Sequence, residues 1–176
     1  MLDNKLGITN QVEFVKMEER ISKTYAKRLY DSGGIKNLEF GTYKGLAAVH
    51  KYVFYDIYDF AGKTRILNIS KENFRFAPSM HLEVSLDHIG SMPQSTIEEI
   101  VAKYVEMNIA HPFRDGNGRS ARIWLDLILK KELRKVVDWN QINKDDYLSA
   151  MERSPVNDLE IRFLISNALN SSIDDL

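Results

Sequence analysis

The stretch from residue 111 to residue 122, His-Pro-Phe-Arg-Asp-Gly-Asn-Gly-Arg-Ser-Ala-Arg, constrains this chain more than any other. It is polar and rich in glycine, yet it separates a segment with apolar residues at helical spacing (97–109) from a nearly all-apolar segment (121–129). Loops normally run over the surface, where water satisfies their backbone groups. A polar loop held between two core helices therefore indicates a site whose residues serve something other than packing.

Composition narrows the classes of protein that such a chain can be. With 176 residues, 44% of them apolar and 28% charged, it is long enough for one domain with a sizeable core. A net charge of −1 gives no electrostatic footprint for nucleic acid or for an anionic membrane. The absence of cysteine excludes disulfides, thiolate catalysis and cysteine zinc sites. No signal peptide and no stretch of roughly 20 apolar residues is apparent, so we expect a cytoplasmic domain.

The hydrophobic pattern predicts a mostly helical chain. After a loose N-terminus, residues 1–9, helices are expected over about 10–31, 41–60, 79–90, 95–111, 119–135, 143–151 and 156–169. The first helix would bury a stripe that includes Val12, Val15 and Ile21. The helix that leads to His111 would open with a capping box formed by Ser95 and Glu98.

A change of period near residue 64 interrupts the helical pattern. Thr64–Ser70 and Phe74–Phe76 are short β-prone stretches around a polar turn, which is typical of a small hairpin, although an irregular connector fits these residues equally well. A lone hairpin is marginal in water, so it must lean on the helices, and its outer edge would remain free to accept a partner strand.

The residues of the loop suit a phosphate ligand. Gly116 and Gly118 let the backbone approach a ligand closely, and the amides of residues 116–119 would lie at the positive end of the following helix. Asp115, Arg119 and Arg122 follow the spacing i, i+4, i+7, so they share one side if the helix begins this early. Two arginines would stabilise a polyphosphate, and one carboxylate beside it would suit Mg²⁺.

Other residues of the loop have separate expected roles. His111 lies within a few residues of this cradle, where a neutral imidazole can accept a proton from a hydroxyl. We expect Phe113 to anchor the loop in the core. Asn117 can satisfy the loop backbone or bind a phosphate oxygen. Taken singly, a histidine, a Gly-Asn-Gly turn and two arginines are more often structural, and only their conjunction favours a nucleotide site.

The remaining histidines are not assigned to the site. His50 lies in an apolar helix and is expected in the core, whereas His81 and His88 are seven apart and lack the further ligands that a metal needs.

The loop resembles the defining motif of the Fic (filamentation induced by cAMP) family, His-x-Phe-x-(Asp/Glu)-Gly-Asn-Gly-Arg-x-x-Arg, and all eight fixed positions match. Tyr52–Arg65 is also similar to the family segment that precedes its flap. The resemblance covers about residues 40–130. Together with the helices and hairpin expected from the pattern, it predicts one domain over residues 1–176. This is a mainly α, Fic-type helical bundle with a small inserted β-hairpin flap at about 64–76, followed by C-terminal helices at about 143–169.

The resemblance implies an adenylyltransferase that moves AMP from ATP onto a tyrosine, threonine or serine hydroxyl of a target protein. Carried over by position, His111 is the general base and Asp115 the Mg²⁺ ligand. Gly116, Asn117 and Gly118 form the anion hole for the α- and β-phosphates.

Further roles follow from the same resemblance. Arg119 and Arg122 would engage the outer phosphates. The flap would hold the target segment by strand addition, with Lys71 at its tip beside the nucleotide. In the phosphotransferase branch of the family a lysine stands at the position of Gly118, so glycine favours AMP transfer.

One element of many family members, an inhibitory (Ser/Thr)-x-x-x-Glu-(Gly/Asn) helix, has no match in this chain. The resemblance then implies an inhibitor in a separate antitoxin or in a helix beyond Leu176, or none, and the position beyond Leu176 is favoured. Small bacterial relatives modify topoisomerase subunits and act as toxins, and several members self-associate, so analogy suggests such a target and leaves the oligomeric state open. The alternatives are phosphotransfer, a nucleotide-binding interaction module without transferase activity, and a purely structural helical domain.

Overall fold

The computed structural model describes residues 2–71 and 74–171. The α-helices within these residues are α1 (Gln11–Asp31), α2 (Tyr43–Phe54), α3 (Leu82–Ser91), α4 (Ile97–Ala110), α5 (Asn117–Leu133), α6 (Lys144–Arg153) and α7 (Leu159–Asn167). Short 3₁₀ turns are η1 (Gly34–Asn37), η2 (Ser79–His81) and η3 (Trp139–Gln141). The strands are β1 (Ser70–Lys71), β2 (Phe74–Arg75), β3 (Val136–Val137) and β4 (Leu169–Asn170). The predicted mainly helical fold is confirmed.

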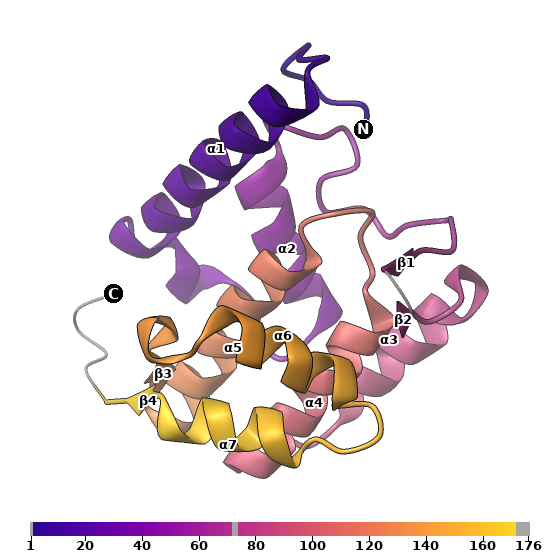
Figure 1. Ribbon diagram of the computed structural model, residues 1–176. Coiled ribbons are helices and arrows are strands. Elements are labelled where there is room, and N and C mark those ends of the chain that lie inside the picture. Colours follow the sequence, from indigo (N-terminus) through magenta and orange to yellow (C-terminus); the bar gives the residue numbers. More distant parts are fainter. Residues whose placement is uncertain (1, 72–73, 172–176) are drawn as a thin grey trace.

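Helix α5 is the centre of the molecule (Figure 1). One side of it, with Trp124 and Ile128, packs into a core shared with α3, α4, α6 and α7. The other side, with Ile123 and Leu127, packs into a second core shared with α1 and α2. Because the middle of α5 is buried on both sides, its sequence is nearly all apolar from Ala121 to Leu129.

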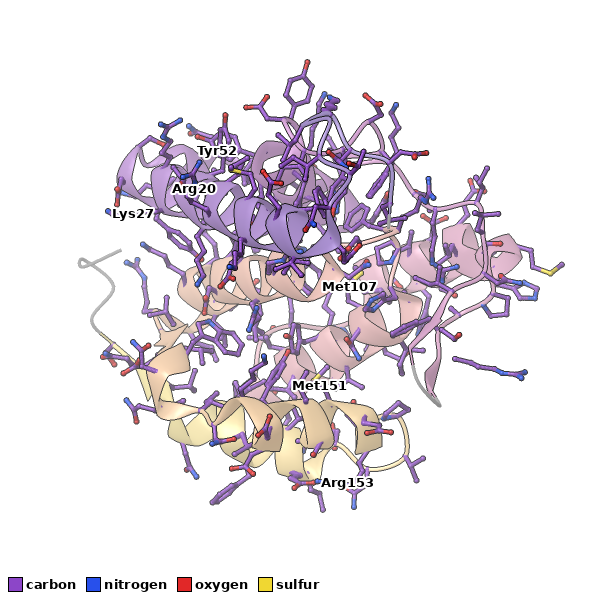
Figure 2. The ribbon with its side chains drawn as sticks, turned by 45° about the horizontal axis from the view of Figure 1, so that its top comes forward. Arg20, Lys27, Tyr52, Met107, Met151 and Arg153 are labelled. Carbon is purple, nitrogen blue, oxygen red and sulfur yellow. The ribbon has the colours of Figure 1, made fainter. Side chains whose placement is uncertain are left out.

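Helix α1 has the predicted bounds but a different buried face. Val12 and Val15, assigned to the buried stripe, are 65% and 48% exposed. The buried face instead includes Phe14, Glu18 and Ser22. The prediction was wrong for Val12 and Val15, because two polar residues of this helix have partners across the fold, whereas Ile21 packs against the second core. Arg20 and Lys27 lie on its outer side (Figure 2).

The N-terminal segment also differs from the expectation of a loose tail. Leu2, Leu6 and Ile8 pack against the second core. The backbone amide of Lys5 donates to the carbonyl of Ile57 at 2.9 Å. Residues 2–9 are therefore attached to the turn that follows α2.

Two helix ends lie elsewhere than predicted. Helix α2 ends at Phe54, and Ile57 and Tyr58 continue the buried stripe in turns rather than in the helix. Helix α4 opens with a capping box of Thr96 and Glu99, one residue later than the Ser95–Glu98 pair. Thr96 has the extended backbone that an N-cap requires, and its hydroxyl accepts from the Glu99 amide at 3.3 Å.

The predicted hairpin is present but short. Strands β1 and β2 are antiparallel, with Ser70 opposite Arg75 and Lys71 opposite Phe74. Residues 64–69 are irregular instead of forming a strand, and the backbone amide of Arg65 donates to the carbonyl of Pro112 at 2.8 Å instead of to a partner strand. In Figure 1 the hairpin lies at one edge of the molecule, beside α3.

The C-terminal part confirms two helices and adds a sheet that the sequence did not reveal. Helix α7 begins at Leu159, three residues later than predicted, and β3 pairs antiparallel with β4. Met151 of α6 and Met107 of α4 belong to one core cluster, which joins this part to the bundle (Figure 2). In the described part of the chain, no helix combines the length and apolarity needed to cross a membrane.

Candidate functional site

The polar loop lies where α4 ends and α5 begins, as predicted. His111 caps α4 in the left-handed region (φ 47°), which is unusual for a residue other than glycine. Gly116 caps the start of α5, also with positive φ (76°). Because the first amides of a helix lack partners within the helix, those at the start of α5 form a site suited to an anion.

Phe113 and Asn117 pin the loop to the core. Phe113 is fully buried, as expected. The Asn117 side chain accepts from the Phe113 amide and donates to the Phe113 carbonyl, both at 2.8 Å. Of the two roles open to Asn117, its side chain therefore fills that of satisfying the loop backbone.

His50 of α2 supports the loop from beneath, a role that its sequence context did not reveal. Its ring stacks on Phe113 with 3.8 Å between centroids. Nδ1 accepts from the Gly62 amide at 2.9 Å, so Nε2 carries the hydrogen and donates to the Asp115 carbonyl at 2.9 Å. Burial lowers the pKa of His50 to about 4, which keeps the ring neutral.

The two glycines of the loop have different surroundings. A Cβ on Gly116 would come within 2.6 Å of the Phe54 ring, so only glycine fits there. A Cβ on Gly118 would meet nothing within 4 Å. Gly116 therefore serves the packing of the loop, whereas Gly118 leaves open space next to it.

The imidazole of His111 has a defined environment. Phe76, just after the flap strand β2, stacks on it with 3.6 Å between ring centroids. Nδ1 lies 3.2 Å from the carbonyl oxygen of Asn108, and since a carbonyl only accepts, Nδ1 carries the hydrogen. In the neutral ring the other nitrogen, Nε2, then holds the lone pair that a general base requires.

Asp115 and Arg119 are linked to each other and to α1. Asp115 precedes α5 instead of sharing its winding, and its Oδ1 lies 3.8 Å from a guanidinium nitrogen of Arg119. Arg119 also donates to Glu18 at 2.7 Å and to Ser22 at 3.0 Å. Sequence reasoning missed these two α1 residues, because nothing in a local pattern reveals a partner about 100 positions away.

Arg122 lies over an indole ring. Its guanidinium carbon is 5.6 Å from the ring centroid of Trp139, within the range of a cation–π contact. Trp139 Nε1 and the Val137 amide each donate to Asp126 at 3.0 Å. Burial raises the pKa of Asp126 to about 6, against the opposing effects of these bonds and of Arg122. Trp139 and Asp126 were not among the predicted site residues.

One cavity of about 620 Å³ brings the predicted loop residues together with the flap and α6. Its lining is Ile69, Ser70, Phe76, Asn108, His111, Arg114, Asp115, Gly116, Asn117, Gly118, Arg119, Arg122, Tyr147, Leu148, Met151 and Glu152. The side chain of Lys71, predicted beside the nucleotide, lies outside the described residues. His81 and His88 are not part of this lining, and the described residues contain no group of three or more His, Cys, Asp or Glu side chains arranged to hold a metal.

Comparison with known proteins agrees with the motif. The model of the Fic/DOC family matches residues 40–129. Protein adenylyltransferase VbhT of Bartonella schoenbuchensis is 29% identical over 161 residues, which are 84% of this chain but only 32% of VbhT. Probable protein adenylyltransferase y4lH of Sinorhizobium fredii is 29% identical over 94% of this chain and 91% of its own length.

Solved structures share the fold. The N-terminal Fic domain of an effector protein from Bartonella sp. AR 15-3 has a TM-score of 0.83 at 18% identity, covering 100% of this chain and 90% of that one. BepC of Bartonella tribocorum, solved with bound AMPPNP, has a TM-score of 0.78 at 18% identity, covering 97% and 92% of the two chains.

Proposed function

This chain belongs to the Fic/DOC family, and we propose that it is an enzyme that transfers AMP from ATP to a tyrosine, threonine or serine hydroxyl of a target protein. The observation that carries this proposal is the cavity that places His111, the glycine loop and two arginines around one space. The names of the relatives VbhT and y4lH support the same reaction.

The phosphates of ATP would bind at the start of α5. Asn117 and Gly118 offer backbone amides at the positive end of a helix that is 17 residues long. The Gly116 amide donates to Asp115 Oδ1 at 2.6 Å in this structure and would turn to the phosphate when the nucleotide binds. Arg122 lines the cavity one turn further along and is expected to engage an outer phosphate. Arg119 would contribute positive charge from the side of α1.

Asp115 is the residue that would hold Mg²⁺. Its side chain is 47% exposed and lines the cavity, so a cation bound there can also reach phosphate oxygens. One carboxylate with phosphate oxygens and water is the ligand set that Mg²⁺ usually takes in nucleotide sites. The bound cation would neutralise charge on the phosphates.

His111 would act as the general base. Its Nε2 accepts the proton of the target hydroxyl while the hydroxyl oxygen attacks the α-phosphorus of ATP. A bond forms between that oxygen and phosphorus, the bond to the bridging oxygen breaks, and pyrophosphate leaves. Most of the rate enhancement would come from alignment and charge stabilisation. Open space at Gly118 is consistent with AMP transfer, for which the family branch keeps glycine.

The flap and the regulation complete the proposal. The free edge of the β1–β2 hairpin would add a strand of the target, and Lys71 would lie beside the nucleotide.

Control would come from an inhibitory glutamate supplied by an antitoxin or by further sequence, acting on Arg122. A topoisomerase subunit is the target that analogy suggests.

The test compares two labels of one substrate. The protein is incubated with Mg²⁺, a bacterial lysate and ATP labelled at either the α- or the γ-phosphate. We expect a labelled protein band only with α-label, and its loss in His111→Ala. His88→Ala, an exposed histidine of α3 outside the cavity lining, is the matched control and should label normally.

Each other outcome selects a different function. Transfer of γ-label identifies a phosphotransferase. Binding of ATP in calorimetry without transfer of either label identifies a nucleotide-binding module. Absence of nucleotide binding would exclude both a transferase and a nucleotide-binding module.

A further inference from the structure

Arg65 is buried beneath the flap and makes contacts that no role above explains. Its side chain is 2% exposed, and burial lowers its pKa from the ordinary value. The guanidinium donates to four backbone carbonyls, and the backbone amide donates to a fifth. No carboxylate among the described residues forms an ion pair with it.

Three of these carbonyls belong to the end of α4 and the catalytic loop. Nε donates to His111 at 2.8 Å and a terminal nitrogen donates to Ala110 at 3.1 Å. The Arg65 amide donates to Pro112 at 2.8 Å. The last carbonyls of a helix lack partners within it, and here the Arg65 side chain satisfies that of Ala110 and that of the cap residue His111. These bonds hold His111 in its left-handed conformation.

The other two carbonyls belong to the residues that lead into and out of the flap hairpin, which we call its two stems. The guanidinium donates to Leu67 at 2.7 Å and to Ala77 at 2.5 Å, one on each side of the hairpin. The Ala77 amide in turn donates to the carbonyl of Ile109 in α4 at 3.0 Å. Both stems of the flap are therefore tied to the same helix end that carries the base.

We propose that Arg65 is a positioning residue that joins the flap and His111 into one rigid unit, so that a strand on the flap is aligned with the base. Arg65 does not line the cavity, so it acts through the backbone and through Phe76, whose ring stacks on His111. Arginine suits this role because its planar fork donates in several fixed directions at once, which lysine cannot do. The claim that Arg65 aligns a target strand with the base rests on the proposed transfer reaction. The claim that Arg65 joins the flap and His111 into one rigid unit does not depend on that reaction.

The variant Arg65→Lys keeps the charge and most of the stem but loses the fork. We expect it to bind AMPPNP with a dissociation constant within about threefold of wild type, because the amides at the start of α5 are untouched. Transfer of α-label should fall about a hundredfold, the usual cost of a misplaced reacting group. Lys63→Ala, a change of an exposed basic residue in the same segment, is the control and should alter neither quantity.

A measurement on the imidazole separates this inference from the proposed reaction. Nitrogen-15 NMR of the His111 ring should show the Nδ1–H tautomer in wild type and a mixture in Arg65→Lys. If wild type transfers no label but this change occurs, the reaction fails and the positioning role stands. A ring spectrum and a transfer rate that both match wild type in Arg65→Lys would overturn the inference.

Hydrogen exchange of the unmodified protein tests the rigid unit without any variant. The amides of Arg65, Ala77 and His111 are all hydrogen-bonded to α4 or to the residue after its cap. We expect them to exchange at rates within about tenfold of one another, as members of one cooperative unit. Exchange at Arg65 and Ala77 a hundredfold faster than at His111 would overturn the inference even if the variants fail to fold.

Discussion

The carboxylate of Glu18 accepts a hydrogen bond at 2.7 Å from the guanidinium of Arg119, the first arginine of the glycine-loop motif. Glu18 also accepts from the Tyr58 hydroxyl at 3.0 Å, and the guanidinium lies 4.7 Å from the centre of the Phe54 ring. Helix α1, which lies outside the segment that the family model matches, thereby fixes the position of a motif residue.

Removing this carboxylate should weaken the fold. Glu18→Ala leaves the buried Tyr58 hydroxyl without its acceptor and removes the nearer carboxylate from the Arg119 guanidinium. We expect a loss of about 2 kcal/mol in the free energy of unfolding. Urea denaturation measures it. Glu19→Ala, one residue away and exposed, should leave the midpoint unchanged, and equal losses in the two variants would contradict this account.

Acid should destabilise the protein through His50. Its pKa of about 4 in the folded state lies below the ordinary 6.5, so the unfolded chain binds a proton first as the pH falls. Stability from this group is therefore complete above pH 6.5 and declines toward pH 4, by about 2 kcal/mol between pH 7 and pH 5. His50→Gln should lack this decline. Urea denaturation of both proteins at the two pH values checks the difference, and a parallel pH dependence would count against it.

Asp126 should act in the opposite direction. Its pKa of about 6 in the folded state lies above the ordinary 3.8, so the folded protein binds a proton first on acidification. The contribution of Asp126 to the free energy of unfolding is present at low pH and is lost as the pH rises through 6. Lowering the pH from 7 to 5 should therefore restore about 1 kcal/mol of stability from this group. Asp126→Asn should therefore lose more stability than wild type over this interval. The same titration measures it, and a smaller loss than in wild type would refute the shift.

The two glycines of the loop should differ sharply when changed to alanine. Gly116→Ala combines positive φ with a collision against Phe54, and we expect it to cost about 2–4 kcal/mol. Gly118→Ala has neither problem and should fold with nearly unchanged stability. Thermal unfolding of the pair tests this, with equal melting temperatures as the contrary result.

Trp139 should report nucleotide binding at Arg122. Because the guanidinium lies over the indole ring, its movement toward a phosphate would change the surroundings of the fluorophore. Addition of Mg²⁺ and ATP should change the emission of wild type, and Trp139→Phe should lose this response. Trp124→Phe, at a fully buried position, should keep it. A response that persists without Trp139 would place the change elsewhere.

Much of the fold followed from local sequence. Helical periodicity located α1 and α4, because side chains repeat on one face of a helix, and the expected helix from Asn143 is present as α6. The inward face of α1 did not follow, since Val12 and Val15 are apolar yet exposed. Hydrophobic periodicity predicts the buried face of a helix only where that face consists of apolar side chains. Glu18 and Ser22 are buried because they bind polar partners, so periodicity does not reveal them.

The sequence by itself determined the chemistry of the loop: which residues could bind phosphate, which could accept a proton, and which family carries that motif. Tertiary structure alone decided what holds those residues in place. His50 supports Asp115 across 65 positions, Arg65 binds His111 across 46, and Glu18 binds Arg119 across 101. The reason is physical: helix propensity and motif spacing act over a few residues. A hydrogen bond between distant segments, by contrast, exists only after packing of the helices has brought its donor and acceptor together.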